Sequence, residues 1–283
     1  GALSVVWFNG GFVAGTLMLD PHDRGFLLGD GVFETVAVIN RRPLWLDEHV
    51  QRMAHAAVEL GIAFSAERTF SGLTEVLKKS EAPCEVLRIT LSRGKAARGL
   101  AGDGASPGPL ITLDEFATQN LFQPCRLQVS QVRRNEFAPS SRLKTLSYID
   151  GIAAAREVAG EADDALMLNT SGHVASATVA NIFAMQGDEL ATPSLDQGVL
   201  SGITRRILLE HAKELGLKPV ERVVPLEDLV RADAVFLCNS LRFIRPVTTL
   251  NGEPLGKGSL DRLIEELGGL AKKQCGTDPR TLM

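Results

Sequence analysis

The chain has 283 residues, of which 45% are hydrophobic and 23% are charged, and its formal net charge is −4 at pH 7. This composition is typical of a globular protein with room for two domains, and the slight negative charge argues against a nucleic-acid partner. We expect no signal peptide, because the first residues lack a basic start, and no membrane span, because no apolar run approaches about 20 residues. Four scattered cysteines without paired spacing favour a reducing compartment and predict a cytoplasmic protein without a metal site.

Local patterns along the chain predict a mixture of strands and helices. The expected strands are a hairpin at 3–15, then 32–40, 85–93, 109–115, 126–134, 164–170, 174–185, 189–193, 234–240 and a strand around 247; the expected helices are 48–61, 67–80, 149–160, 201–216 and 259–273; loops are expected at 20–31 and 94–108. Asp47 is expected to cap the first helix and Gly61 to end it. Because strands and helices do not alternate strictly, the pattern favours an α+β fold.

The polar stretch 116–124 is the best candidate for an inter-domain linker, since it ends in Pro124. We therefore expect a smaller N-terminal α/β domain at 1–115 and a larger C-terminal α/β domain at 125–283. The larger domain would carry both the candidate lysine and the candidate phosphate site described next.

A lone lysine occurs in the stretch 141-SRLKTLSYIDG-151. In an extended run, Lys144, Leu146 and Tyr148 point to the same side, and Leu143, Thr145 and Ser147 point to the other. No carboxylate lies within three residues of Lys144. A lysine in such apolar surroundings is easily deprotonated, as an amine nucleophile must be. A solvated lysine on an edge strand is the alternative interpretation.

Several other residues could bind anions. The expected helix 201–216 begins at Ser201-Gly202, so the amides of Ile203 and Thr204 and the Thr204 hydroxyl suit a phosphate, although Ser-Gly is also an ordinary helix cap. The further candidates are Arg98, in a glycine- and alanine-rich loop that suits capture of a carboxylate; Arg52, on the first helix; and Asn239 and Ser240, at the end of an apolar strand. Each of these also has an ordinary structural explanation.

The common nucleophile, nucleotide and zinc-protease motifs are absent from the sequence. The remaining hints are an activatable lysine, a phosphate cradle and an arginine for a carboxylate. Pyridoxal 5′-phosphate requires the first two, and an amino-acid substrate requires the third.

The order of these motifs resembles the fold type IV pyridoxal-phosphate enzymes, which include branched-chain aminotransferases, D-amino-acid aminotransferases and 4-amino-4-deoxychorismate lyases. The resemblance covers nearly the whole chain, and its motifs are 24-RGFLLGDGVFET-35, 49-HVQR-52, 92-SRGKAARG-99, 144-KTLSY-148, 172-GHVASATVANIF-183, 201-SGITR-205 and 238-CNSLRFIRPV-247. It implies a two-domain architecture like that of D-amino-acid aminotransferase, pyridoxal 5′-phosphate as the cofactor, and a homodimer.

The resemblance also implies roles for individual residues. Lys144 would join the cofactor as a Schiff base, and Tyr148 would approach its phenolic oxygen. Arg52, the amides of Ile203 and Thr204, and Ser240 would hold the phosphate. Phe33, Arg98 and Asn239 would line the substrate side. Leu100 stands where the D-amino-acid branch has a histidine, which argues against full D-amino-acid specificity.

The largest departure from the family pattern is Ser176, where the family places a glutamate that keeps the pyridine nitrogen protonated. A serine hydroxyl supplies no such charge. Three explanations remain: a different balance of reactions, another acid such as Asp163 or Asp164, or a weakly active protein.

The interpretation favoured by the sequence is a class IV aminotransferase acting on an amino acid of the branched-chain or D-amino-acid type. A 4-amino-4-deoxychorismate lyase, which releases pyruvate and leaves 4-aminobenzoate, is the second hypothesis. A cofactor-binding protein with weak or no catalysis is the third, and a dimeric binding protein without cofactor is the fourth.

Overall fold

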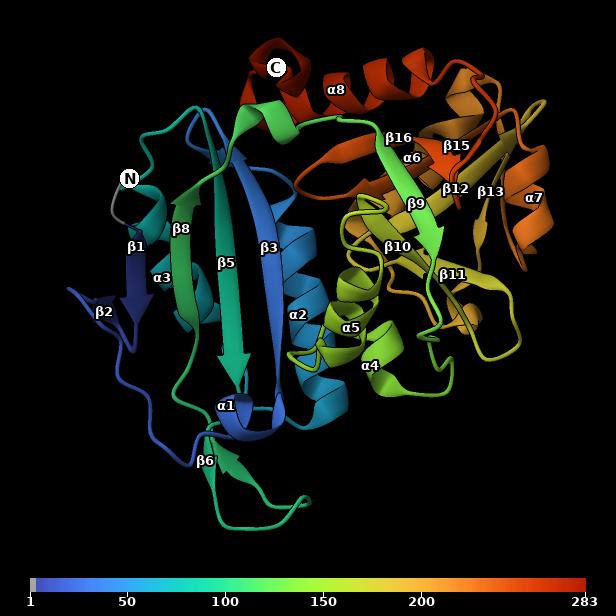
Figure 1. Cartoon of the computed structure of the whole chain (residues 1–283). Helices are drawn as coiled ribbons and strands as arrows, with labels where there is room; N and C mark the ends of the chain where they lie inside the picture. Colours follow the sequence, from blue (N-terminus) through green and yellow to red (C-terminus); the bar gives the residue numbers. More distant parts are fainter. Residues whose placement is uncertain (1–3) are drawn as a thin grey trace. The chain divides into compact units, whose positions relative to one another are not determined.

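The computed structural model describes residues 4–283, and the β-branched runs of the chain form two large sheets (Figure 1). The chain divides into two units. The first contains the residues up to Thr118 together with Lys144–Tyr148 and Ala271–Leu282, and the second contains Gln119–Leu143 and Ile149–Leu270. The predicted α+β class is confirmed by this mixture of helices and strands.

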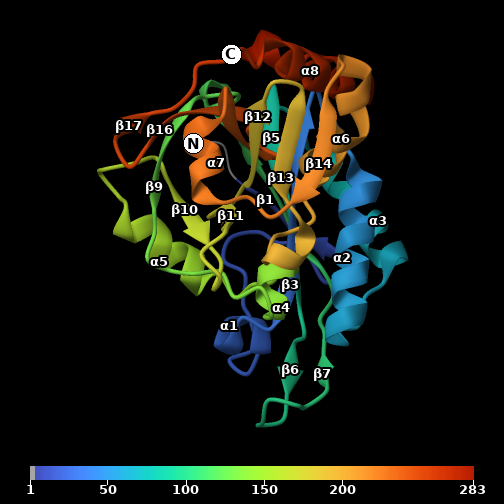
Figure 2. The same ribbon diagram turned by 90° about the vertical axis from the view of Figure 1, so that its right-hand side faces the viewer.

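The first unit is built on a six-stranded antiparallel sheet in the order β2-β1-β8-β5-β3-β4. Its strands are β1 (Val5–Phe8), β2 (Gly11–Phe12), β3 (Gly31–Ile39), β4 (Arg42–Pro43), β5 (Cys84–Ser92) and β8 (Leu110–Glu115). Two amphipathic helices, α2 (Leu46–Leu60) and α3 (Ala66–Leu77), pack on one face of the sheet (Figure 2). Because side chains alternate along a strand, Leu87, Ile89 and Leu91 of β5 are buried toward these helices.

Three short elements complete the first unit. Helix α1 (Arg24–Leu28) is capped at its N-terminus by Asp23, whose side chain accepts hydrogen bonds from the amides of Gly25 and Phe26. Strands β6 (Lys95–Ala96) and β7 (Gly104–Ala105) form a hairpin of their own, visible below α1 in Figure 2.

The second unit is built on a nine-stranded mixed sheet in the order β11-β10-β9-β16-β15-β12-β13-β14, with β17 paired to β16. Its strands are β9 (Cys125–Val129), β10 (Asp164–Leu168), β11 (Val174–Ala177), β12 (Asn181–Gln186), β13 (Glu189–Pro193), β14 (Lys218–Arg222), β15 (Ala234–Asn239), β16 (Phe243–Leu250) and β17 (Glu253–Pro254). Its helices are α4 (Pro139–Arg142), α5 (Ile149–Glu157), α6 (Ile203–His211) and α7 (Leu226–Arg231), while α8 (Asp261–Cys275) extends across the boundary of the two units.

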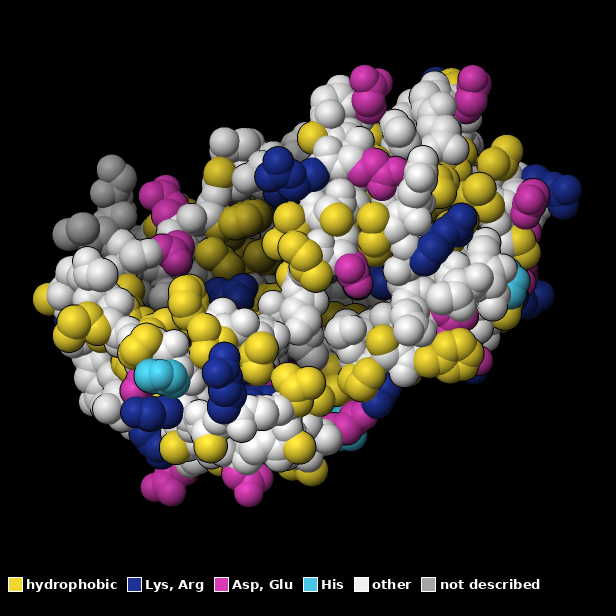
Figure 3. Space-filling view, turned by 60° about the horizontal axis from the view of Figure 1, so that its bottom comes forward, with side chains coloured by type: hydrophobic (Ala, Val, Ile, Leu, Met, Phe, Trp, Pro, Cys, Tyr) yellow, Lys and Arg dark blue, Asp and Glu magenta, His cyan; other side chains and the backbone are white. Residues whose placement is uncertain are grey.

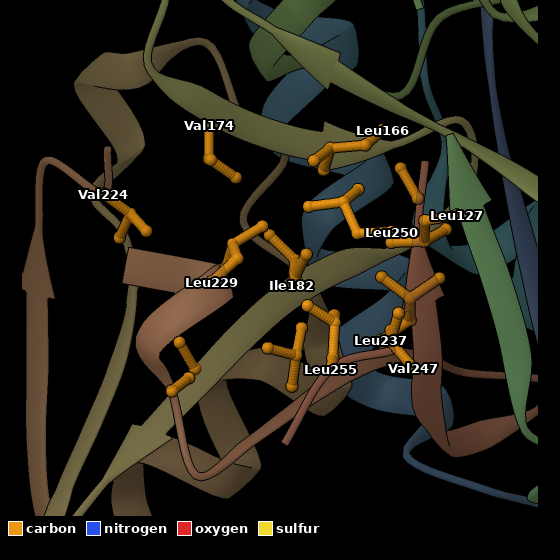
Figure 4. Close-up of a cluster of buried hydrophobic side chains, with 14 of the residues drawn as sticks. Leu127, Leu166, Val174, Ile182, Val224, Leu229, Leu237, Val247, Leu250 and Leu255 are labelled. Atoms are coloured by element: carbon orange, nitrogen blue, oxygen red, sulfur yellow. The ribbon is translucent and has the colours of Figure 1, made fainter. Parts of the chain in front are cut away.

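The core of the second unit is a cluster of aliphatic side chains between its sheet and α7 (Figure 4). Leu166, Ile182 and Leu237 come from three different strands and Leu229 comes from α7, and all four are almost completely buried. Burying a side chain of this size contributes about 1.5–3 kcal/mol, so this cluster fixes the strands that lead to the candidate site residues.

Several predicted elements differ from the structure. Helix α2 begins at Leu46 after Trp45, which adopts a left-handed conformation, so the predicted cap by Asp47 is wrong, whereas Gly61 ends the helix as expected. The expected strand 174–185 is split into β11 and β12, because its residues pair with different neighbouring strands. The loop expected at 20–31 contains α1, the loop expected at 94–108 contains the β6–β7 hairpin, and the short elements β14 and α7 were not foreseen.

The boundary between the two units lies within the predicted linker 116–124. The segment Lys144–Tyr148, however, belongs to the first unit, whereas the sequence placed it in the C-terminal domain. The reason is a backbone contact: Thr145 forms a bridge with Val32 on the edge of β3 that β5 does not occupy. The domain limits themselves remain a prediction.

Candidate functional site

The segment that carries Lys144 is held against β3 by backbone hydrogen bonds. The Phe33 amide donates to the Lys144 carbonyl oxygen at 3.1 Å, and the Leu146 amide donates to the Gly31 carbonyl oxygen at 3.0 Å. A side chain at Gly31 would meet the Leu91 backbone carbonyl oxygen at 2.6 Å and the Leu146 Cδ1 atom at 2.6 Å, so only glycine fits at this position. This close approach fixes Lys144 beside the first residues of β3.

The Lys144 side chain rests on aromatic rings. Its Nζ atom lies 4.4 Å from the centre of the Phe33 ring and 5.9 Å from that of Tyr148, and the two rings meet edge to face at 5.3 Å. Among the residues that the structure describes, no carboxylate pairs with this amine and no group hydrogen-bonds to it. The prediction of an amine without a carboxylate partner thus agrees with the geometry.

Arg52 lies in a buried charged cluster of the first unit. Its Nε and Nη2 atoms each donate to a different oxygen of Glu34 at 2.7 Å, and the Nδ1 atom of His49 lies 2.7 Å from Glu34 Oε2. Glu34 comes from β3 and the other two residues come from one face of α2, three positions apart. This bidentate pairing fixes the orientation of the Arg52 guanidinium.

Two groups of this cluster, Glu34 and His49, have shifted pKa values. Burial raises the pKa of Glu34, but the Arg52 charge and the hydrogen bonds from Arg52 and His49 outweigh burial and lower that pKa to about 2. Burial lowers the pKa of His49 despite the neighbouring carboxylate. His49 is therefore neutral, its Nδ1–H donates to Glu34, and its buried Nε2 atom has no hydrogen-bond partner among the described residues.

In the second unit, the N-terminus of α6 offers free donors. Gly202 is the N-cap and has no side chain to satisfy the first amides, and a side chain there would collide with the Asn181 Oδ1 atom. The Thr204 hydroxyl is buried and has no hydrogen-bond partner among the residues that the structure describes. An unpaired buried hydroxyl beside the positive end of a helix suits an anion.

The neighbouring candidates Asn239 and Ser240 lie at the end of β15. The Asn239 side chain accepts the amides of Leu241 and Arg242 at 3.1 and 2.8 Å, and it donates to the Val179 carbonyl oxygen at 3.2 Å. These hydrogen bonds occupy the side-chain amide of Asn239 and stabilise the turn after β15. Ser240 is half-buried and remains a candidate for the phosphate.

Ser176 is buried in β11, opposite Met167 of β10, and its hydroxyl donates to the Ala177 carbonyl oxygen at 2.8 Å. The two acids that could replace the missing glutamate are already occupied. Asp163 pairs with Arg126 on the surface at 3.0 Å, and Asp164 accepts the Thr178 hydroxyl at 2.6 Å. By strand alternation Asp164 also points to the face of β10 opposite to Met167, so neither acid is placed to substitute at Ser176.

Arg98 lies at an exposed position in the connection between β6 and β7. Hydrogen bonds from Arg24 hold the middle of this connection in place. The buried Arg24 donates to the carbonyl oxygens of Gly99 and Leu100 at 2.6 and 2.8 Å, and Arg24 and Arg93 share one oxygen of Asp30 at 2.7 Å each.

The donors present in each unit fit pyridoxal 5′-phosphate. The first unit supplies an amine without a carboxylate partner for an aldehyde, and the second supplies an orphaned buried hydroxyl at a helix N-terminus for a phosphate.

The family model for class IV amino-transferases matches residues 31–250. The chain belongs to this family. The predicted resemblance to fold type IV enzymes is confirmed, and with it the prediction of an enzyme that uses pyridoxal 5′-phosphate, the cofactor of the family.

The known relatives include enzymes with different activities. The chain is 31% identical to the aminodeoxychorismate lyase of Bacillus subtilis, over 90% of this chain and 94% of that protein. It is 28% identical to the D-alanine aminotransferase of Bacillus licheniformis, over 90% and 91% of the two chains. A crystal structure of a putative 4-amino-4-deoxychorismate lyase from Legionella pneumophila has 33% identity and a TM-score of 0.84, covering 90% of this chain and 96% of that one.

Sequence reasoning missed two parts of this class IV site. Glu34 was not singled out, although a lone acid in the apolar strand 32-VFETVAVIN-40 is a signal of a buried pair. His49 was not singled out either, although its spacing of three from Arg52 places both on one helix face.

We expect that Arg98→Ala raises KM for substrates with an α-carboxylate by about 10-fold or more, because a charge-assisted hydrogen bond is lost. Simple amines without a carboxylate should be affected far less. Steady-state kinetics on an amino acid and on its decarboxylated amine measure the difference, and equal effects on both would remove Arg98 from the carboxylate role.

Proposed function

We propose that Lys144 is the amine that binds pyridoxal 5′-phosphate covalently and that the chain catalyses transamination of an amino acid. The observation that carries the proposal is the Lys144 amine, held over Phe33 and Tyr148 with no carboxylate partner among the described residues. When bound, the cofactor supplies an electron sink for the negative charge that develops at the substrate Cα atom.

The residues of the site would then have separate roles in catalysis and in cofactor binding. Lys144, once displaced by the substrate amine, removes and returns the Cα proton as a general base. The amides of Ile203 and Thr204, the Thr204 hydroxyl, Arg52 and Ser240 bind the phosphate. The buried and unpaired state of the Thr204 hydroxyl supports this assignment.

The lyase reaction is the second candidate, and sequence identity favours it. The relatives described as lyases reach 31% and 33% identity, whereas the D-alanine aminotransferase has 28%. Both reactions begin with removal of a proton by the same lysine, so they differ in the pocket that holds the rest of the substrate. A bulky cyclohexadiene dicarboxylate needs more room and more cationic groups than a small amino acid.

A half-reaction screen decides between the candidates. The purified holoenzyme is mixed with D- and L-amino acids and, separately, with 4-amino-4-deoxychorismate. Loss of the visible absorbance of the bound cofactor with an amino acid supports transamination, and formation of fluorescent 4-aminobenzoate supports the lyase. No change with any substrate would contradict both and favour a protein that binds the cofactor without catalysis.

We expect that Ser176→Glu increases the transamination rate by about 10-fold, because a carboxylate there would stabilise a protonated pyridine ring through a charged hydrogen bond. Ser176→Gln is the control of equal size without charge. Single-turnover kinetics measure the rates, and circular dichroism checks that both variants fold. An unchanged rate in Ser176→Glu would show that the missing charge does not limit the reaction.

We further propose that the protein is a homodimer. Exposed apolar side chains support this: Phe26, Leu27 and Leu28 of α1 and Leu100 beyond β6 are between 50% and 81% exposed in the single chain. Hydrophobic side chains are frequent on the face that contains these elements (Figure 3). Sedimentation analysis of the holoenzyme tests the proposal, and a monomer at micromolar concentration would refute it.

The cytoplasmic location also remains a proposal. It is supported by the four cysteines, which are all buried free thiols. The structure contains no helix, within residues 4–283, that is long and apolar enough to cross a membrane. Fractionation of the source cells measures the location directly.

A further inference from the structure

Three side chains of the second unit bring metal-binding atoms together, apart from the candidate site described above. They are His211, the last residue of α6; Glu214, in the short 3₁₀ turn Ala212–Leu215; and Glu266, on α8. One imidazole nitrogen and one oxygen from each carboxylate all lie within 4.8 Å of one another. Within residues 4–283, no other three side chains of histidine, cysteine, aspartate or glutamate meet so closely.

The local backbone explains why His211 and Glu214 face the same way. The α-helical geometry of α6 changes to a 3₁₀ turn after His211, and Gly216 ends this turn in a left-handed conformation. Side chains that are three positions apart eclipse each other in a 3₁₀ helix. Glu214 therefore lies over His211, and its Oε2 atom is 3.3 Å from the His211 Nδ1 atom.

Helix α8 supplies the third side chain from a distant part of the chain. Leu263 and Leu267, four positions apart on one face of α8, are almost completely buried and fix the helix in place. The end of α6 lies beside α8 (Figure 2), and the Glu266 Oε1 atom is 3.7 Å from the His211 Nδ1 atom. The sequence did not reveal this group, because Glu266 is remote from the other two residues along the chain.

The spacing of these atoms matches the coordination shell of a zinc ion. Zinc binds imidazole nitrogen and carboxylate oxygen at about 2.0–2.2 Å in a tetrahedral arrangement, which places the ligand atoms about 3.3–3.6 Å apart. The two distances from the His211 Nδ1 atom, 3.3 and 3.7 Å, agree with this range. A fourth position is open to water, because the side chains of His211, Glu214 and Glu266 are 31%, 67% and 30% exposed.

The two carboxylates of this group have no lysine or arginine as a partner. Among the described residues, no such ion pair involves Glu214 or Glu266, whereas the nearby Arg206 pairs with Glu210 at 3.8 Å. Two carboxylates that meet at one imidazole repel each other, and a divalent cation would neutralise both. A nitrogen ligand favours a transition metal over magnesium or calcium, which prefer oxygen.

We propose that His211, Glu214 and Glu266 form a binding site for a divalent transition-metal ion such as zinc. The ion would join the C-terminal end of α6 to α8 and stabilise the contact between the two helices. Because α6 rises about 1.5 Å per residue, the site lies about 12 Å from the amides at the start of this nine-residue helix. The inference therefore does not depend on the proposed catalytic function.

The test measures zinc binding by the holoenzyme after dialysis against a chelator. Titration calorimetry with zinc chloride gives the Kd and the stoichiometry, and the melting temperature reports stabilisation. The variants His211→Gln, Glu214→Gln and Glu266→Gln each remove one ligand. His55→Gln is the matched control, because His55 also lies on a helix beside a glutamate, 3.8 Å from Glu59.

We expect stoichiometric binding of zinc in the wild type and in His55→Gln. The Kd should rise by about 10- to 100-fold or more in each ligand variant, at least the loss that follows removal of an outer-shell partner. At a zinc concentration about 100 times the Kd, the melting temperature of the wild type should rise by about 5 °C, and that of His211→Gln should not change. Magnesium should bind much more weakly than zinc.

A protonated His211 paired with both carboxylates is the alternative arrangement, and it leaves no place for a cation. A wild-type protein that binds no zinc would overturn the proposal, and so would zinc binding that is equally tight in wild type, His211→Gln and Glu266→Gln. Glu214 is largely exposed, so Glu214→Gln provides the same comparison if another variant does not fold. Equal affinity for magnesium and zinc would contradict a histidine ligand.

Discussion

Lys144→Ala is expected to abolish the visible absorbance of the covalently bound cofactor and to lower the rate of the reaction by at least about 10²–10⁴-fold, the usual contribution of a positioned general base. The reason is that one amine both holds the cofactor and moves the Cα proton. Absorbance spectra of the purified variant and single-turnover kinetics with an amino acid measure the two effects.

Lys79→Ala is the matched control for this experiment. Lys79 also lies over an aromatic ring, 5.6 Å from the centre of Phe12, but it is exposed at the end of α3. This variant should keep the spectrum and the rate of the wild type. A Lys144→Ala protein that retained the cofactor band would show that another amine carries the cofactor.

The position of Lys144 illustrates what the sequence could predict and what it could not. The alternation around Lys144 and the absence of nearby acids in sequence were sufficient to single the residue out. The partner segment was not predictable, because the contact with β3 joins residues more than 100 positions apart and depends on the missing side chain of Gly31. This contact also explains why the lysine belongs to the first unit.

The start of α6 was predictable for the opposite reason. Helix caps are determined by neighbouring residues, and the sequence 201-SGIT-204 shows a glycine cap followed by free amides. Strand β5 was only partly predictable from the sequence. Its alternation revealed a strand but not which face is covered, because the partner strand β3 lies about 50 positions away in sequence.

The roles of charged residues depended on partners that are distant in sequence. Arg52 was predicted as a phosphate ligand from a motif, and the structure adds that Glu34 fixes its guanidinium in a bidentate pair. Asp163 and Asp164 were equivalent candidates in the sequence, but the structure pairs one with Arg126 and the other with Thr178. Long-range pairing of this kind is set by packing and cannot be inferred from local spacing.

The buried cluster of Glu34, His49 and Arg52 leads to a prediction about stability. Glu34→Gln is expected to lower the free energy of unfolding at neutral pH by about 3–5 kcal/mol, because it leaves the Arg52 charge without its partner. The same change should weaken cofactor binding, since Arg52 would lose its fixed orientation. Chemical denaturation measures the stability, and cofactor titration of the unloaded protein measures the affinity.

The pH dependence of this effect has a defined sign. The Glu34 pKa is about 2 in the folded protein and 4.5 for an ordinary glutamate, so its contribution is complete above pH 4.5 and is lost as the pH falls from 4.5 toward 2. The size of that loss is about 3 kcal/mol. His49 adds a loss that begins below its ordinary pKa of 6.5, because burial disfavours its protonation in the folded protein.

Glu115→Gln is the control, since Glu115 is exposed at the end of β8 in the same sheet. Wild type and Glu115→Gln should lose stability together between pH 4.5 and 2, whereas Glu34→Gln should start lower and change less over that range. Denaturation curves for the three proteins at several pH values separate these outcomes. If Glu34→Gln matched the wild type in both stability and cofactor affinity, the cluster would have no role in orienting Arg52, and the phosphate assignment of that arginine would lose its structural support.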